Sequence, residues 1–159
     1  MPSEPVSYDP ATQARIRVFH AGRSYITLGH VCEPGKKESI HAAAGGYSFM
    51  VPNKVIGIPR TDDMRSFSYH EYVIPAGQTV TVEHYWSDPT SYGPGRSCGP
   101  YYYAFEPLAG TDYDTSILFK GGFCVGIEVR RLVPTDDGKI ITYPARPVSN
   151  GSFSRCPRR

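Results

Sequence analysis

Glycine and proline recur so often in this chain that few stretches are long enough for a stable helix. The sequence has 16 Gly and 15 Pro among 159 residues, and both residue types disfavour helix interiors. Between these breaks, apolar and polar residues alternate in stretches such as 14–20, 67–75 and 79–86. A period of two residues is the pattern of a strand that buries one of its faces. Turn residues return about every ten positions, as in antiparallel sandwiches and barrels.

We therefore predict an all-β fold, a disulfide-linked antiparallel β-sandwich of immunoglobulin-like or transthyretin-like type with about seven to nine strands. Aromatic residues make up 13% of the chain, with 12 Tyr, and such rings pack well on a pleated sheet. Residues 1–13 are polar and rich in proline, and they predict a flexible leader. Residues 14–159 are then expected to form a single domain.

The order of the turns predicts which strands are neighbours. Residues 14–31 and 67–86 each contain two alternating stretches around a short turn, so both predict antiparallel hairpins. Residues 40–51 stay open, because their alanines also allow a short helical turn. Further strands, of which the second to fourth predict a meander, are expected at 53–58, 101–107, 111–120, 123–132 and 140–144.

The cysteines favour an oxidising compartment. Four are present, at Cys32, Cys98, Cys124 and Cys156, and none has the C-x-x-C spacing of a zinc ribbon or a thioredoxin-like site. Two structural disulfides account for scattered cysteines in a loop-rich domain, whereas four buried free thiols are the cytosolic alternative. We favour the pairs Cys98–Cys124 and Cys32–Cys156, the first because both residues lie at one end of the predicted meander.

Charge and hydropathy exclude several classes of partner. The net charge is +2 and the basic residues are scattered, so no nucleic-acid partner is expected. No apolar run is long enough for a transmembrane segment, and residues 1–13 lack the basic and apolar parts of a signal peptide. A cytosolic protein and an exported protein without its signal both fit. The cysteines favour the exported one, periplasmic or outer-membrane-associated.

No enzymatic motif is present. The chain lacks G-x-S-x-G, H-E-x-x-H, P-loop and G-x-G-x-x-G patterns, so we predict a non-enzymatic protein without a cofactor, with an unrecognised hydrolase as an alternative. His70 and His84 could meet across the predicted hairpin and bind a metal, but packing among tyrosines explains them more simply. We therefore predict no metal site. Asp112 and Asp114 share one face of a strand.

The aromatic residues are the main candidates for binding. Tyr101 and Tyr103 point to one side of a strand and Tyr102 to the other. We predict that Tyr102 fills the core beside Ala104 and that the other two lie outside, although a slip of one residue would exchange the faces. Such side chains either pack structurally or form a surface for a ligand or protein. The predicted binding residues are Trp86, Tyr92, Arg96, Tyr101 and Tyr103.

The stretches VIPAGQTVTVEHYW and YAFEPLAGTDY carry a resemblance. Their rhythm of strand, glycine turn and strand is similar to that of small bacterial envelope lipoprotein modules, the PEGA-like and DUF2846-like β-sandwiches. The resemblance covers the central part of the chain and rests on Gly77, Val80, Val82, Gly110 and Tyr113. It implies a β-sandwich in the periplasm or on the outer membrane, commonly attached through a lipidated cysteine. This sequence has no cysteine before Arg15.

Together these features predict a non-enzymatic envelope module that binds another protein or assists assembly. The partner would be an envelope component or a cognate toxin. The alternative is an inhibitor or immunity protein that neutralises a toxin or hydrolase by inserting a loop, either 87–97 or 60–66.

Overall fold

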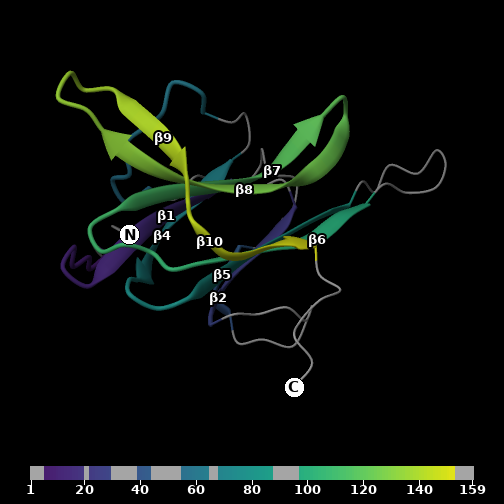
Figure 1. Cartoon of the computed structure of the whole chain (residues 1–159), viewed down its shortest axis with the longest axis horizontal. Helices are drawn as coiled ribbons and strands as arrows, with labels where there is room; N and C mark the ends of the chain where they lie inside the picture. The colour runs from purple at the N-terminus through teal and green to yellow at the C-terminus, as the bar shows by residue number, and fades with distance from the viewer. Residues whose placement is uncertain are drawn as a thin grey trace, which may run out of the picture.

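The computed structural model describes residues 6–19, 22–29, 39–43, 55–64, 68–87 and 97–152. These residues form ten strands in two five-stranded sheets, and no helix occurs among them (Figure 1). The prediction of an all-β protein is confirmed. Every pair of neighbouring strands is antiparallel except β1 and β7, which are parallel.

Strand β1 connects distant parts of the sequence in the first sheet, where it pairs with β4 on one side and with β7 on the other. The strand order of the first sheet is β4 (Tyr69–Pro75), β1 (Gln13–Phe19), β7 (Asp112–Lys120), β8 (Phe123–Pro134) and β9 (Ile140–Pro144). The order of the second is β10 (Pro147–Ser152), β6 (Ser97–Phe105), β5 (Val80–Ser87), β2 (Arg23–Leu28) and β3 (Ser39–Ala43).

Both predicted hairpins in the first half of the chain are wrong. The chain crosses from the first sheet to the second between β1 and β2, and again between β4 and β5. The predicted meander is also divided, since β6 belongs to the second sheet while β7 and β8 form a hairpin in the first. A short glycine-containing link can turn within a sheet or cross between two sheets, and alternation alone does not distinguish these cases.

Several strand boundaries also differ from the sequence prediction. Residues 55–58 are irregular, although 53–58 was expected to be a strand. Strand β6 begins at Ser97, four residues earlier than predicted, and β10 was not predicted. The ambiguous region 40–51 contributes to β3, and its remaining residues lie outside the described ranges.

The hydrophobic core lies between the two sheets. Alternate residues of β1, such as Ile16 and Val18, meet Val82 of β5 and Phe105 of β6 in one buried cluster. Buried side chains of this size each contribute roughly 1.5–3 kcal/mol relative to exposure. Ahead of β1, the Tyr8 ring lies 4.7 Å from the Arg15 guanidinium, so the last part of the predicted leader contacts the sheet.

One disulfide joins the sheets. Cys98 on β6 and Cys124 on β8 are bonded, with their Cα atoms 6.0 Å apart. This predicted pairing is confirmed, and it bridges two facing sheets rather than the first and third strands of a meander. Cys32 and Cys156 lie outside the described residues.

Loss of this disulfide should destabilise the domain strongly. The two cysteines are separated by 26 positions, and closing a loop of that size contributes about 3.5 kcal/mol in the chain-entropy model. Urea unfolding of the Cys98→Ala/Cys124→Ala variant should show a loss of about this size. Alkylation followed by intact mass provides the control. If these two thiols can be alkylated in the native protein without reductant, the disulfide is contradicted.

Candidate functional site

The tyrosines of β6 lie on the opposite faces from those predicted. Tyr101, Tyr103 and Phe105 pair with His84, Val82 and Val80 of β5, and this row faces the first sheet. Tyr103 is only 7% exposed, and its hydroxyl donates a hydrogen bond to the Ala145 carbonyl oxygen. The register is therefore shifted by one residue from the predicted one, and Tyr103 is not part of an outer platform.

Tyr102 occupies the outer face of the second sheet. It pairs with Glu83 of β5, and both residues are buried. Burial raises the pKa of the Tyr102 hydroxyl well above its ordinary value, and the Glu83 carboxylate raises it further. Tyr102 is thus enclosed, although not in the core that lies between the sheets.

An aromatic pair spans the two sheets beside the disulfide. The rings of Trp86 on β5 and Phe119 on β7 meet edge to face, with centroids 5.8 Å apart. Trp86 is the register partner of Cys98, and Phe119 is the register partner of Cys124. The disulfide and the ring contact therefore join the same two register pairs, one in each sheet. Figure 1 shows the β7–β8 hairpin and the start of β6 at the same end of the molecule.

Exposed apolar side chains gather at this end. Phe123 is 62% exposed, Val125 is 59% exposed and Phe119 is 39% exposed, while Trp86 is half-buried. We call these four residues the apolar rim. Exposed apolar side chains that lie close together are a feature of interaction surfaces.

At two glycines the chain passes very close to the backbone of β5, next to the rim. A Cβ atom at Gly22 would lie 2.2 Å from the Tyr85 carbonyl oxygen, and one at Gly99 would lie 2.7 Å from the His84 carbonyl oxygen. Both distances are far below contact, and both glycines have positive φ. Only glycine permits the chain to approach β5 so closely here, where the strand also carries a bulge.

The remaining predicted binding residues divide into two groups. Tyr101 is half-buried on the inner face of β6, next to the rim. Tyr92 and Arg96 lie outside the described residues, but the segment that carries them is joined to Ser87 and Ser97. These two serines are register partners beside Trp86 and Cys98. The structure therefore places both ends of the predicted binding loop at the rim.

His70 and His84 do not meet across a hairpin, because their strands lie in different sheets. His84 is fully buried, and its two ring nitrogens hydrogen-bond to Ser24 of β2 and Thr115 of β7, each at 2.9 Å. It thus links the sheets through side chains. The described residues contain no cluster of three or more metal-binding side chains.

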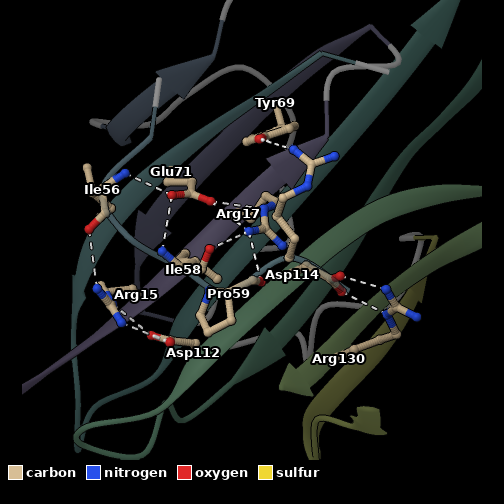
Figure 2. Close-up of polar contacts among 11 residues, drawn as sticks. Arg15, Arg17, Ile56, Ile58, Pro59, Tyr69, Glu71, Asp112, Asp114 and Arg130 are labelled. Atoms are coloured by element: carbon tan, nitrogen blue, oxygen red, sulfur yellow. Dashed lines mark hydrogen bonds and ion pairs between the residues drawn. The ribbon is translucent and has the colours of Figure 1, made fainter. Parts of the chain in front are cut away.

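A row of alternating charges crosses the outer face of the first sheet. Glu71, Arg17, Asp114 and Arg130 come from four neighbouring strands and are register neighbours (Figure 2). The Arg17 guanidinium lies 2.9 Å from Glu71, and Arg130 contacts both oxygens of Asp114 at 2.8 and 2.6 Å. Arg17 and Glu71 are fully buried and Asp114 is 2% exposed. We call this row the charge ladder.

The segment 55–64 covers the charge ladder. Glu71 accepts hydrogen bonds from the backbone N–H groups of Ile56 and Ile58, at 2.8 and 3.3 Å. Arg17 donates to the carbonyl oxygens of Ile58 and Pro59, at 2.8 and 3.0 Å (Figure 2). An irregular segment has no ladder partners of its own, so the buried ionic groups satisfy its backbone.

Asp63 fixes the end of the same segment. Its carboxylate accepts a hydrogen bond from Arg130 at 2.7 Å, and this contact lowers the pKa of Asp63. Burial raises the pKa of Asp114, while the Arg130 guanidinium opposes that shift. Each carboxylate of the ladder is occupied by an arginine, which indicates a structural role rather than proton transfer to a substrate.

The sequence indicates which charged residues share a strand face, but not which strands are neighbours. Alternation over residues 14–20 places Arg15 and Arg17 on one face of their strand, just as it places Asp112 and Asp114 on one face of theirs. Arg15 does pair with Asp112 through two bonds of 2.8 and 2.9 Å. The parallel pairing of β1 with β7 brings these residues together, and no local pattern indicates that pairing.

No protein-family model, curated protein or solved structure matches this chain. The resemblance to envelope lipoprotein modules therefore stays a prediction. No helix in the described ranges has the length and hydrophobicity that crossing a bilayer requires.

Neutralising Glu71 should be far more costly than neutralising Asp112. Glu71→Gln removes the carboxylate charge that is bonded to the buried Arg17, and breaking a buried pair costs about 3–5 kcal/mol. Asp112→Asn changes a pair whose side chains are 14% and 20% exposed, so its cost should be about 1 kcal/mol. Urea unfolding of the two variants measures the difference. Equal losses would show that the ladder is no more critical than the outer pair.

Proposed function

We propose that this protein is a non-enzymatic binding or assembly module of the bacterial cell envelope, periplasmic or outer-membrane-associated, which recognises another protein through the apolar rim. The observation that carries this proposal is the exposure of Phe119, Phe123 and Val125 at a hairpin end fixed by the Cys98–Cys124 disulfide. A disulfide that joins two sheets fits an oxidising, exported location.

Rigid apolar surface favours protein recognition for a physical reason. Side chains that are already held in place lose little conformational freedom on binding, so more of the burial energy contributes to affinity. The Trp86–Phe119 contact and the disulfide restrict the rim in this way. Tyr92 and Arg96 have the side chains most often found at binding hot spots, and they stay predicted contributors together with Trp86 and Tyr101.

The second candidate function is inhibition of a toxin or hydrolase by loop insertion. Its support is that segment 88–96 joins the sandwich at Ser87 and Ser97, directly beside the rim. The other predicted loop, 60–66, is less suited to insertion because Asp63 is bonded to Arg130 on the first sheet.

A double substitution in the rim should remove partner binding. A photo-crosslinking residue at Phe123 in the bacterium that encodes the protein should capture the partner, and the same residue at Ile141 should not. With the purified partner, Phe123→Ser/Val125→Ser should weaken binding by about 2 kcal/mol or more, roughly thirtyfold. Both side chains are exposed, so the melting temperature should change little.

The matched control is Ile141→Ser, which replaces another exposed apolar side chain, on β9. Undiminished affinity in the rim variant, or an equal loss in the control, would move the interface elsewhere. Stoichiometric inhibition of a purified hydrolytic partner would favour the inhibitor function over the assembly function.

A further inference from the structure

Arg131 differs from the other arginines of the first sheet. Arg15, Arg17 and Arg130 each bind a carboxylate on the outer face. Arg131 follows Arg130 in the strand and therefore points to the opposite face, where it lies 5.4 Å from the centre of the Tyr143 ring. Within the described part of the chain it forms no ion pair with a carboxylate.

Arg131 lines a hollow at the far end of the sandwich from the rim. The hollow has a volume of about 530 Å³ and lies beside the crossover from β9 to β10, which Figure 1 shows passing from one sheet to the other. Arg131 follows Cys124 by seven residues along β8, a distance of roughly 23 Å. The size is within the usual range of small-molecule sites.

The lining combines two guanidinium groups with apolar walls. Arg131 and Arg146 supply the positive charge, and Glu106 is the acidic residue among the lining residues. Leu108 and Val148, which are 53% and 58% exposed, form the accessible apolar wall, whereas the rings of Phe105 and Tyr113 at the same hollow are buried. Two arginines and one carboxylate leave a net positive charge beside an apolar surface.

Hydrogen bonds hold the walls of the hollow in place. The Tyr113 hydroxyl accepts a bond of 3.0 Å from the Leu108 N–H group. The Ala145 N–H group donates to the Val129 carbonyl oxygen at 2.8 Å, and the Ala145 carbonyl oxygen accepts the Tyr103 hydroxyl. The crossover is thus attached to both sheets. A site that exists before its ligand arrives loses less free energy on binding.

We propose that this hollow binds a small organic carboxylate, with the carboxylate group against Arg131 and Arg146 and an apolar body against Leu108 and Val148. A guanidinium matches the two oxygens of a carboxylate in a planar, paired geometry. The apolar walls favour an organic ligand over a bare inorganic anion, because they offer no hydrogen bonds to a fully hydrated ion. This site is independent of the proposed function of the rim.

NMR titration of the whole protein tests the proposal with three probes. Phenylacetate should cause saturable shifts in the amide signals around the hollow. Its neutral isostere, phenylacetamide, and inorganic sulfate should bind at least about tenfold more weakly. Equal binding of the amide would eliminate the charge contact, and equal binding of sulfate would eliminate the apolar one; either result, or no saturable shift with phenylacetate, overturns the proposal.

Variants locate the charge contact. Arg131→Gln and, separately, Arg146→Gln should each weaken phenylacetate binding at least about tenfold. Arg146 is exposed, so its replacement leaves the fold intact even if that of Arg131 does not. Arg23→Gln removes the same charge from an exposed position on β2 and should change nothing. An equal loss in Arg23→Gln would reduce the effect to net charge and overturn the site. The rim variant should bind phenylacetate normally, so the two proposals fail separately.

Discussion

The buried guanidinium of Arg17 is held between the Glu71 carboxylate and the carbonyl oxygens of Ile58 and Pro59. This interaction constrains how the first sheet is assembled, because a buried charge that loses its counter-charge costs about 3–5 kcal/mol. A slip of one residue between β1 and its neighbours would turn Arg17 into the core. A slip of two would separate it from Glu71. The charge ladder therefore specifies the register of β1 with both β4 and β7.

The opposite face of β1 carries the core, so one strand connects the ionic layer to the apolar one. Ile16 and Val18 are buried against the second sheet, while Arg15 and Arg17 bind acidic side chains under segment 55–64. His84 adds a polar link between the sheets through Ser24 and Thr115. With this interior established, the disulfide and the β9–β10 crossover attach the two sheets at their opposite ends.

Part of this structure was predictable from the sequence, and the limits have physical causes. Alternation correctly placed Arg15 with Arg17 and Asp112 with Asp114, since each pair lies within one strand. It also placed Tyr101 and Tyr103 on one face but assigned that face to the outside, because a period of two residues indicates sides without identifying which one is buried. Which sheet a strand joins depends on pairings distant in sequence, so the two crossings were missed. The Cys98–Cys124 pair was predicted because both residues lie at one end of their strands, and the facing sheets bring these ends closer than the first and third strands of a meander, which lie about 10 Å apart.

The way the sheets are covered explains why recognition is expected at strand ends. The inner faces are used by the core, and the outer face of the first sheet is covered by segment 55–64 over the charge ladder. On the outer face of the second sheet, Thr81, Glu83, Tyr102 and Ala104 are also buried. Five described large apolar side chains are more than half exposed: Val55 is the one on segment 55–64, Phe123 and Val125 lie at one end of the strands, and Leu108 and Val148 lie by the hollow at the other. The two ends of the sandwich therefore offer different chemistry: an exposed hydrophobic group at the disulfide, and a hydrophobic hollow with two arginines at the crossover.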